Sequence, residues 1–298
     1  MKLMCNKITL ISEICCNHNG SIELAENMID TLATFPQEYK VDVIKFQKRT
    51  PKLILTEKEY NAPHPKKENA FAETYGLHRE FLEFSVEQHS YLKKYCENKG
   101  FKYSSSVFDI QSAKEILSLE PEMIKISSAN NTDYSLLRYI DDNFDGEIHI
   151  SLGMTTKSEE EMIFNCIKNN RKNLILYACT SAYPTTVGNI CLLEICRLQE
   201  KFKNEIKGIG FSGHHEGILQ DIAAVALGAS YIERHFTLDK TLKGTDQPIS
   251  LNPKEFLELS KNIKTIYKDL KYKEADILDV EQDVRKRLKI YDNGVYTS

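Results

Sequence analysis

The chain has 298 residues, of which 41% are apolar, and its 39 basic and 43 acidic side chains give a formal net charge of −4. A chain of this size buries a large core, but it has no cationic excess with which to hold a nucleic acid or an anionic membrane surface. No apolar run approaches the ~20 residues of a membrane-spanning helix, and polar residues interrupt the N-terminus where a secretory signal needs an apolar core. We therefore expect a soluble cytoplasmic protein whose partners are neither nucleic acid nor membrane.

The cysteines form no C-x-x-C pair and no closely spaced framework. A chain of this length needs no disulfide staples. We expect free, buried thiols rather than disulfides or a zinc site. The residues concerned are Cys5, Cys15, Cys16, Cys96, Cys166, Cys179, Cys191 and Cys196.

Short β-branched runs alternate with longer amphipathic stretches along the chain. Eight runs predict strands that begin near Ile8, Val41, Phe101, Met123, Glu147, Asn173, Ile206 and Tyr231. The stretches between them predict helices over residues 22–35, 81–96, 110–119, 136–142, 158–167, 192–202 and 217–227. A last helix is expected over 253–270, with Asn252 as the N-cap before Pro253.

Strands that alternate with helices imply parallel pairing, because parallel neighbours need crossover connections. The repeats predict a (β/α)8 TIM barrel over residues 1–270, a fold that typically takes about 250 residues. A doubly wound open sheet is the alternative. The widest gap between strands contains residues 48–79, a polar, proline-containing insertion that we expect to cover the substrate at the active-site end of the barrel. Residues 271–298 predict a short charged tail.

Polar side chains gather at the predicted strand ends, where a TIM barrel carries its chemistry. They include Glu13, Lys45, Gln47, Ser106, Lys125, Ser128, Ser151, Ser181, Tyr183, Ser212, His214, Glu233 and His235, with Asp246 in the loop after the last strand. Lysine side chains are rarely buried in proteins. The placement of Lys45 and Lys125 within predicted strands therefore favours a functional role for both. The structural alternative is an ion pair with Glu13 or Glu233, and a single serine at a strand end is as often a helix cap.

Two histidines, His214 and His235, are predicted at the ends of neighbouring strands, where they can converge on one metal ion. His215 must point away from His214 in an extended strand, and the shared side with Ser212 selects His214. The other histidines considered, His64, His78 and His89, are expected on loop or helix surfaces.

The lysines and hydroxyls suit a small phosphorylated acid. A divalent ion with open coordination positions suits Lewis-acid activation of a carbonyl group. Together these features indicate carbon–carbon bond formation between a phosphorylated acid and an aldehyde.

Seven segments, in order, resemble the sialic acid (nonulosonic acid) synthases over roughly residues 8–270. They are SEICCNHNGS (12–21), IKFQK (44–48), MIKISSAN (123–130), ISLGM (150–154), YACTSAYPT (177–185), GFSGHHEG (210–217) and IERHFTLDKTLKGTDQPISL (232–251). The resemblance implies that phosphoenolpyruvate condenses with N-acetylmannosamine or a related amino-hexose and water. The products are a nine-carbon 2-keto-3-deoxy acid and phosphate, which leaves by C–O cleavage.

The resemblance also implies roles for individual residues. Phosphoenolpyruvate would be held by Lys45, Ser106, Lys125, Ser128, Ser151, Ser181 and Ser212. The sugar would contact Gln47, Asn130, Tyr183 and Asp246. His214 and His235 would bind the cofactor, Mn²⁺ or Mg²⁺. The catalytic residues would be Glu13, Lys45, Lys125 and Asp246.

The sequence departs from the family at several positions. Asn130 stands where many members carry Glu, Ser181 where some carry Asn, Ser106 where Thr is common, and Gly213 where Asp is common. Many members continue into an antifreeze-like domain that lends an arginine to the sugar site of a partner subunit. The resemblance thus implies a homo-oligomer, and we expect this chain to lack that domain, which leaves the sugar open.

Three other functions remain open. Another 3-deoxy sugar acid synthase would need a basic cluster for a phosphorylated aldose, for which Lys48, Arg49, Lys66 and Lys67 are candidates. A Schiff-base aldolase would use Lys45 or Lys125 as its nucleophile. A non-catalytic barrel would bind a sugar without turning it over.

Overall fold

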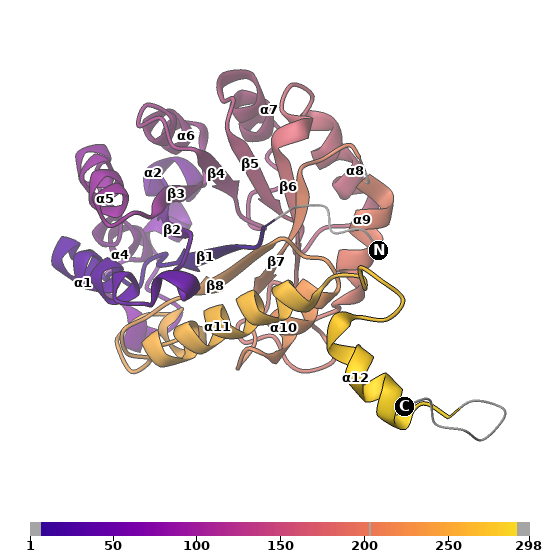
Figure 1. Ribbon diagram of the computed structural model, residues 1–298. Coiled ribbons are helices and arrows are strands. Elements are labelled where there is room, and N and C mark those ends of the chain that lie inside the picture. The colour runs from indigo at the N-terminus through magenta and orange to yellow at the C-terminus, as the bar shows by residue number, and fades with distance from the viewer. Residues whose placement is uncertain (1–6, 203, 291–298) are drawn as a thin grey trace.

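The computed structural model describes residues 7–202 and 204–290. Within this part of the chain, eight parallel strands close into one barrel in chain order, with β8 paired to β1 (Figure 1). The strands are β1 (Thr9–Glu13), β2 (Val43–Lys48), β3 (Lys102–Val107), β4 (Met123–Ile126), β5 (Glu147–Ser151), β6 (Leu174–Cys179), β7 (Gly208–Gly213) and β8 (Tyr231–His235). The predicted TIM barrel is confirmed, and its closure rules out the doubly wound open sheet.

Helices surround the barrel on the outside (Figure 1). They are α1 (Ile22–Ala33), α5 (Val86–Asn98), α6 (Ile110–Leu117), α7 (Tyr134–Asn143), α8 (Lys157–Cys166), α9 (Leu193–Phe202), α10 (Leu219–Ala226) and α11 (Pro253–Asp269). Short 3₁₀ turns occur at Gln37–Tyr39 (η1), Lys67–Asn69 (η2), Arg171–Asn173 (η3) and Gln247–Ile249 (η4). The predicted N-cap of α11 is confirmed: the Asn252 side chain accepts a hydrogen bond from the Glu255 backbone N–H, and Pro253 follows it.

Side-chain alternation along the strands divides the core in two. Outward-facing residues such as Leu10 and Phe46 pack with the helices in one large apolar cluster. A smaller buried cluster faces inward and consists of Ile11, Val43, Met123, Ile175, Tyr177 and Tyr231. Two residues further along each of several strands, the inward positions become polar. The barrel is therefore apolar at its base and polar at the strands' carboxyl ends.

The predicted helix over 81–96 is wrong at its start. The helix α4 (Tyr75–Phe81) ends there, and α5 begins only at Val86. Ser85 starts α5 as its N-cap, because its side chain accepts a hydrogen bond from the Gln88 N–H while the Gln88 side chain accepts one from the Ser85 N–H.

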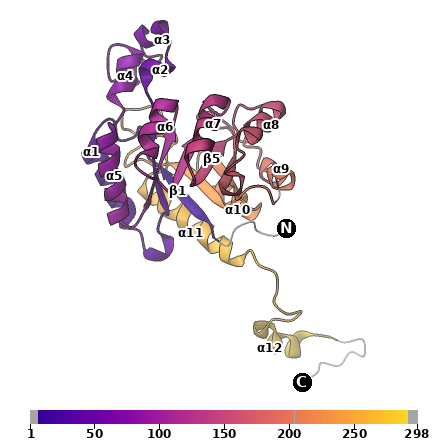
Figure 2. The same ribbon diagram turned by 90° about the horizontal axis from the view of Figure 1, so that it is seen from above.

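The segment between β2 and α5 contains α2 (Pro51–Ile54), α3 (Glu57–Asn61), η2 and α4. These short helices stand out from one end of the barrel, the end that follows the carboxyl terminus of β2 (Figure 2). Lys48 belongs to β2 itself, so the strand extends one residue into the expected insertion.

The expectation of surface histidines is wrong for His64, His78 and His89, which are all buried. The rings of His64 and His78 pack against each other within the insertion, with centroids 4.4 Å apart. His89 lies on α5 with its Nδ1 atom 2.8 Å from the Tyr103 hydroxyl. Aromatic neighbours cover these rings, and no local pattern in the sequence marks that cover.

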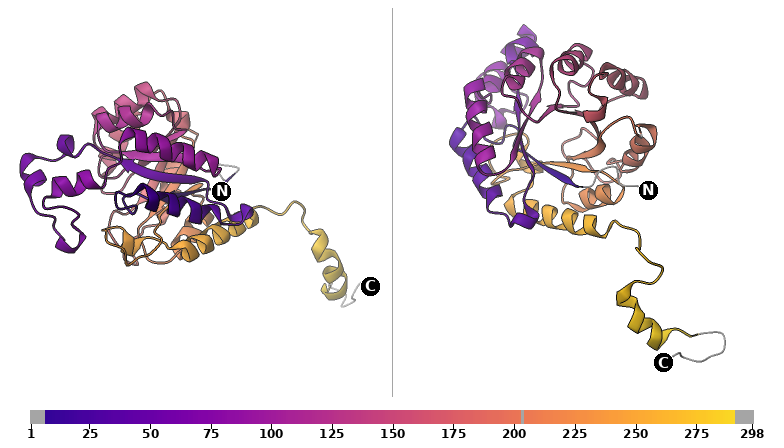
Figure 3. Two further views of the ribbon diagram at one scale, coloured as in Figure 1. Left: turned by 90° about the vertical axis from the view of Figure 1, so that its left-hand side faces the viewer. Right: turned by 45° about the horizontal axis from the view of Figure 1, so that its top comes forward.

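The helix α12 (Asp279–Leu288) follows α11 and lies apart from the barrel (Figure 3). Residues 291–298 of the expected tail, and Cys5, lie outside the described residues. Every cysteine in the described part of the chain is free, as expected, but only Cys96 and Cys166 are buried. Cys191 is exposed, and the other described cysteines are half-buried: Cys15, Cys16, Cys179 and Cys196. No helix among the described residues is long and apolar enough to cross a membrane.

Candidate active site

A cavity of about 310 Å³ lies at the carboxyl ends of the barrel strands, and every strand contributes to its lining. It brings together all of the residues predicted for the site except Asn130. Those lining it are Glu13, Lys45, Gln47, Ser106, Lys125, Ser128, Ser151, Ser181, Tyr183, Ser212, His214, His235 and Asp246. The closed barrel thus collects side chains that are up to 233 positions apart in the sequence, since 246 − 13 = 233.

Asn130 lies beside the cavity rather than in its lining. Its amide nitrogen donates a hydrogen bond of 2.6 Å to the Phe108 carbonyl, and its amide oxygen accepts one of 2.8 Å from the Ser127 hydroxyl. Both ends of the amide are therefore engaged in holding the loop after β4.

Two lysines and two glutamates form a buried quartet at the base of the cavity, each between 2% and 6% exposed. Lys45 contacts Glu13 directly and lies 3.7 Å from Glu233. Lys125 donates to both Glu233 oxygens at 3.1 and 3.0 Å. The ion-pair alternative from the sequence is therefore correct for both lysines, even though they face the cavity. Since the formal charges cancel, an incoming anion competes with carboxylates for the ammonium groups.

Burial shifts the titration of this quartet. The pKa of Lys45 is lowered to about 7, because burial and the positive charge of Lys125 together outweigh the opposing effect of Glu233. Burial also lowers the pKa of Lys125. For Glu233, burial alone would raise the pKa, but Lys125 and Lys45 outweigh it and hold that pKa below its usual range. The charge of Lys45 can therefore change near neutral pH.

Serine hydroxyls surround the quartet. Ser106 accepts a hydrogen bond of 2.7 Å from Lys45, and Ser212 donates one of 3.2 Å to Glu233. The hydroxyls of Ser128 and Ser181 lie 2.7 Å apart. Gly153 packs closely against these hydroxyls. A Cβ atom at this position would lie 2.1 Å from the Ser181 hydroxyl, so only glycine fits without adjustment. The arrangement offers fixed cations and donors to a compact anion.

A second group on the cavity wall can hold a metal ion. Three residues each offer one potential ligand atom, and these atoms lie within 4.8 Å of one another: Cys15, His235 and Asp246. The Nδ1 atom of His235 has no hydrogen-bond partner among the described residues. Burial lowers the pKa of His235, which favours the neutral imidazole that metals bind. A neutral imidazole, a carboxylate and a thiol fit a divalent ion.

His214, the predicted partner of His235, lines the cavity with its ring centroid 5.6 Å from that of His235. Its Nδ1 atom lies 3.3 Å from the Thr180 carbonyl oxygen. His215 lies outside the cavity lining, 3.2 Å from Asp221, so side-chain alternation correctly placed His214 rather than His215 at the cavity.

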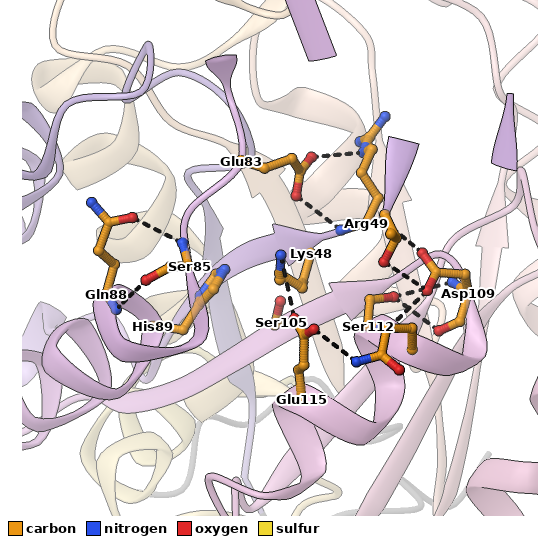
Figure 4. A network of polar contacts seen from close by, with 12 residues as sticks. Lys48, Arg49, Glu83, Ser85, Gln88, His89, Ser105, Asp109, Ser112 and Glu115 are labelled. Carbon is orange, nitrogen blue, oxygen red and sulfur yellow. Dashed lines mark hydrogen bonds and ion pairs between the residues drawn. The ribbon is translucent and has the colours of Figure 1, made fainter. Parts of the chain in front are cut away.

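Two arginines line the wall: Arg49, which the sequence offered only as a phosphate-binding candidate, and Arg79, which sequence reasoning missed. The backbone N–H of Arg49 donates to Glu83 at 2.8 Å and its Nε atom lies 3.1 Å from the same carboxylate (Figure 4). Arg79, on α4, donates to the Tyr75 hydroxyl at 3.0 and 2.7 Å and forms no ion pair among the described residues. Nothing local in the sequence marks Arg79, because it reaches the cavity only through the fold of the insertion.

The other basic candidates from the sequence lie elsewhere. The Lys48 ammonium is 3.4 Å from Glu115, on the outer side of β2 (Figure 4). Lys66 and Lys67 are exposed and outside the cavity lining. Of the predicted cluster, only Arg49 reaches the site.

Residues 33–275 match the NeuB family. The chain belongs to the NeuB family. Over 94% of its length it is 32% identical to the N-acetylneuraminate-9-phosphate synthase of Homo sapiens, of which it covers 76%. It is also 32% identical to the N,N'-diacetyllegionaminic acid synthase of Campylobacter jejuni, with 88% of this chain and 77% of that protein covered. The NeuB membership confirms the resemblance seen in the sequence motifs.

Among solved structures, the chain is similar to the N-acetylneuraminic acid synthetase of Leptospira borgpetersenii serovar Hardjo-bovis in complex with citrate. The TM-score is 0.79 at 29% identity, and the match covers 95% of this chain and 93% of the other. The similarity therefore extends over the whole NeuB barrel.

Proposed function

We propose that this NeuB-family protein is a nonulosonic acid synthase, a transferase that condenses phosphoenolpyruvate with N-acetylmannosamine or a related hexose and water. The observation that carries the proposal is the buried lysine–glutamate quartet within a wall of serine hydroxyls. Phosphoenolpyruvate is a compact polyanion, and this wall supplies the cations and donors that it needs.

Binding of phosphoenolpyruvate frees the carboxylates of the quartet. As Lys45 and Lys125 turn to the phosphate and carboxylate groups, Glu13 loses its direct contact with Lys45. A bond forms between C3 of phosphoenolpyruvate and the aldehyde carbon, and water adds to C2. We propose that Glu13 takes the proton from that water, after which the C2–O bond breaks and phosphate leaves.

Mn²⁺ or Mg²⁺ is the proposed cofactor. When bound, a divalent ion supplies Lewis-acid polarisation of the aldehyde oxygen. His214, which directly follows β7, and His235, at the end of the neighbouring β8, would hold it, and Asp246 lies within reach of His235. Gln47 and Tyr183 remain to give directional hydrogen bonds to the aldose.

Arg79 favours a second acceptor class, a hexose that carries a distal phosphate. Its guanidinium lines the cavity without a carboxylate partner among the described residues, and Arg49 lies on the same wall. The human relative is named for a 9-phosphorylated product. A phosphate at the far end of the sugar would form the charge-assisted pair that Arg79 lacks.

The test is a phosphate-release assay with phosphoenolpyruvate, Mn²⁺ or Mg²⁺, and a panel of free and 6-phosphorylated N-acetylhexosamines. We expect release only when metal and an acceptor hexose are both present. Label in the bridging oxygen of phosphoenolpyruvate should leave with the phosphate. No release with any acceptor would overturn the proposal, and a borohydride-trapped lysine adduct would indicate the Schiff-base aldolase instead.

The acceptor class is tested with Arg79→Gln. For a phosphorylated hexose we expect kcat/KM to fall by about 10- to 150-fold, the value of a lost charged hydrogen bond of about 1.5–3 kcal/mol. The free hexose should be affected little. Equal effects on both acceptors would contradict a phosphate contact at Arg79.

We also propose that residues 1–270 form the synthase unit with 48–79 as its substrate cover and 271–298 as a tail. The position of Arg79 in the cavity wall supports the role of the insertion. We further propose a cytoplasmic homo-oligomer, since phosphoenolpyruvate is a cytoplasmic metabolite and the family shares sites between subunits.

A further inference from the structure

Lys125 has a second close neighbour besides Glu233. Its ammonium nitrogen lies 3.5 Å from the centroid of the Tyr177 ring on β6, and the Glu233 oxygens accept from it at 3.1 and 3.0 Å. Tyr177 is fully buried in the inward-facing cluster at the base of the barrel. The lysine that we assign to phosphoenolpyruvate therefore stands between a carboxylate and the face of an aromatic ring.

A chain of polar contacts fixes the Tyr177 ring through its hydroxyl group. The hydroxyl oxygen lies 2.7 Å from Nδ1 of His149, and Nε2 of the same imidazole lies 3.2 Å from the Glu147 carboxylate. Lys207 and Tyr231 donate hydrogen bonds to that carboxylate at 2.8 and 3.2 Å. The ring is therefore anchored from the base of the barrel, away from the cavity.

The charge of Glu147 sets the direction of these hydrogen bonds. Burial would raise the pKa of Glu147, but hydrogen bonds from His149 and Lys207 outweigh it and lower that pKa to about 2. An ionised carboxylate can only accept, so Nε2 of His149 carries the imidazole proton and Nδ1 accepts from the Tyr177 hydroxyl. A phenol that donates its proton in this way becomes more electron-rich, which strengthens the attraction of its ring face for a cation.

The neighbouring strand β7 leaves room for the ring at Gly210. This glycine is the residue of β7 that pairs with Tyr177. A Cβ atom at Gly210 would lie 2.4 Å from the Cε1 atom of the Tyr177 ring, so a larger residue would push the ring aside. The first glycine of the motif GFSGHHEG (210–217) therefore has a physical role in seating this ring.

The ring and the carboxylate act differently on Lys125. Glu233 cancels the charge of the ammonium group and competes with an incoming anion. A neutral aromatic ring attracts the cation and leaves its full charge available to a ligand. The ring also compensates an ammonium group that has lost its water, since Lys125 is only 2% exposed. The contact can thus persist when Glu233 gives up its hydrogen bonds.

We propose that Tyr177 is a positioning residue for phosphoenolpyruvate. Its ring holds the Lys125 ammonium at the base of the cavity while the ammonium changes partner from Glu233 to the anion. His149 and Gly210 hold the ring in this place. The inference rests on the proposed function only for the identity of the anion.

The test compares Tyr177→Leu, which removes the ring, with Tyr177→Phe, which keeps it, in the full-length protein. We expect calorimetric titration without the sugar to show phosphoenolpyruvate binding weakened about 30-fold in Tyr177→Leu, which corresponds to a buried cation–ring contact of about 2 kcal/mol. Tyr177→Phe should stay within about threefold of the wild type, because its ring face remains. In turnover assays the loss should appear in KM rather than kcat, since Tyr177 touches Lys125 and not the reacting atoms.

Ile175→Ala is the matched control for damage to the barrel. Ile175 faces inward on the same strand, two residues before Tyr177, and is also fully buried. Its truncation leaves a cavity and should lower the urea midpoint, as Tyr177→Leu does, while the Kd for phosphoenolpyruvate stays within about threefold of the wild type. Equal weakening of binding in Ile175→Ala and Tyr177→Leu would reduce Tyr177 to a structural role and overturn the proposal.

NMR spectroscopy of protein labelled with ¹³C at lysine Cε tests the contact without substrate. A ring centred 3.5 Å from the ammonium nitrogen should move the ε-methylene proton signal of Lys125 upfield, and Lys125→Met identifies that signal by its loss. The upfield signal should persist in Tyr177→Phe and disappear in Tyr177→Leu.

The two measurements separate this inference from the proposed function. If the wild type lacks the upfield signal, or if Tyr177→Leu binds phosphoenolpyruvate as the wild type does, the inference alone is overturned. If the wild type shows the upfield signal and binds no phosphoenolpyruvate, the contact is supported and the proposed function is defeated.

Discussion

The pair formed by Lys125 and Glu233 allows a test in which two substitutions have a similar effect on stability and different effects on substrate binding. Lys125→Met removes the cation and leaves the Glu233 carboxylate with Ser212 at 3.2 Å and Lys45 at 3.7 Å. Breaking a buried pair in this way typically costs about 3–5 kcal/mol of unfolding free energy. Glu233→Gln removes the other partner and should cost a similar amount.

Phosphoenolpyruvate affinity should separate the two variants. The quartet of Glu13, Lys45, Lys125 and Glu233 has no formal net charge. Lys125→Met makes it negative and removes a charged donor, so binding should weaken by about 1.5–3 kcal/mol, or roughly 10- to 150-fold in Kd. Glu233→Gln makes it positive and releases Lys125 from competition, so binding should be unchanged or tighter.

The measurements are urea unfolding for stability and calorimetric titration of phosphoenolpyruvate without the sugar for binding. The double variant Lys125→Met/Glu233→Gln should be more stable than the sum of the single losses implies, by a coupling of about 0.5–3 kcal/mol. Additive losses would refute the ion pair as a stabilising unit. Equal weakening of phosphoenolpyruvate binding in both single variants would refute the role of Lys125 as an anion ligand.

Three further substitutions probe the cavity wall and the residues packed behind it. Gly153→Ala places a methyl group against the Ser181 hydroxyl, 2.1 Å away before any adjustment, and should raise KM for phosphoenolpyruvate with little change in the urea midpoint. In the wild type, kcat/KM for phosphoenolpyruvate should fall as pH rises through about 7, because Lys45 loses its proton there. Lys45→Arg stays charged and should lose this alkaline limb even if its activity is low; an unchanged limb would show that another group titrates. Asn131→Ala removes the buried amide that donates to the Ser151 carbonyl at 2.9 Å, and urea unfolding should show a loss of about 1–3 kcal/mol. No loss would contradict a structural role for that amide.

Much of the fold was predictable because it depends on local patterns. Alternation of β-branched runs with amphipathic stretches identified the strands, and the short crossovers required them to be parallel. The sequence also indicated which side of β2 faces into the barrel. Lys45 and Gln47 share a side because side chains alternate along a strand, and both are polar. The same alternation correctly placed His214, and not His215, at the cavity.

The prediction was wrong where a local pattern competes with its surroundings. Ser85 and Gln88 begin a new helix within a stretch that reads as one amphipathic run. His89 looks like a surface residue of a polar helix, yet β3 presents Tyr103 to it and buries it completely. In both places a specific hydrogen bond decides the structure.

The sequence by itself determined the barrel, the NeuB motifs and the order in which polar residues reach the strand ends. Only the tertiary structure decided which charges meet, because ion pairing depends on distances across the barrel that no local pattern encodes. It paired Lys125 with Glu233, brought Arg79 from the insertion to the cavity, and turned the thiol of Cys15 towards Asp246. Closing the last strand onto the first produced that final contact, and with it the group of potential metal ligands that the sequence left divided between its two ends.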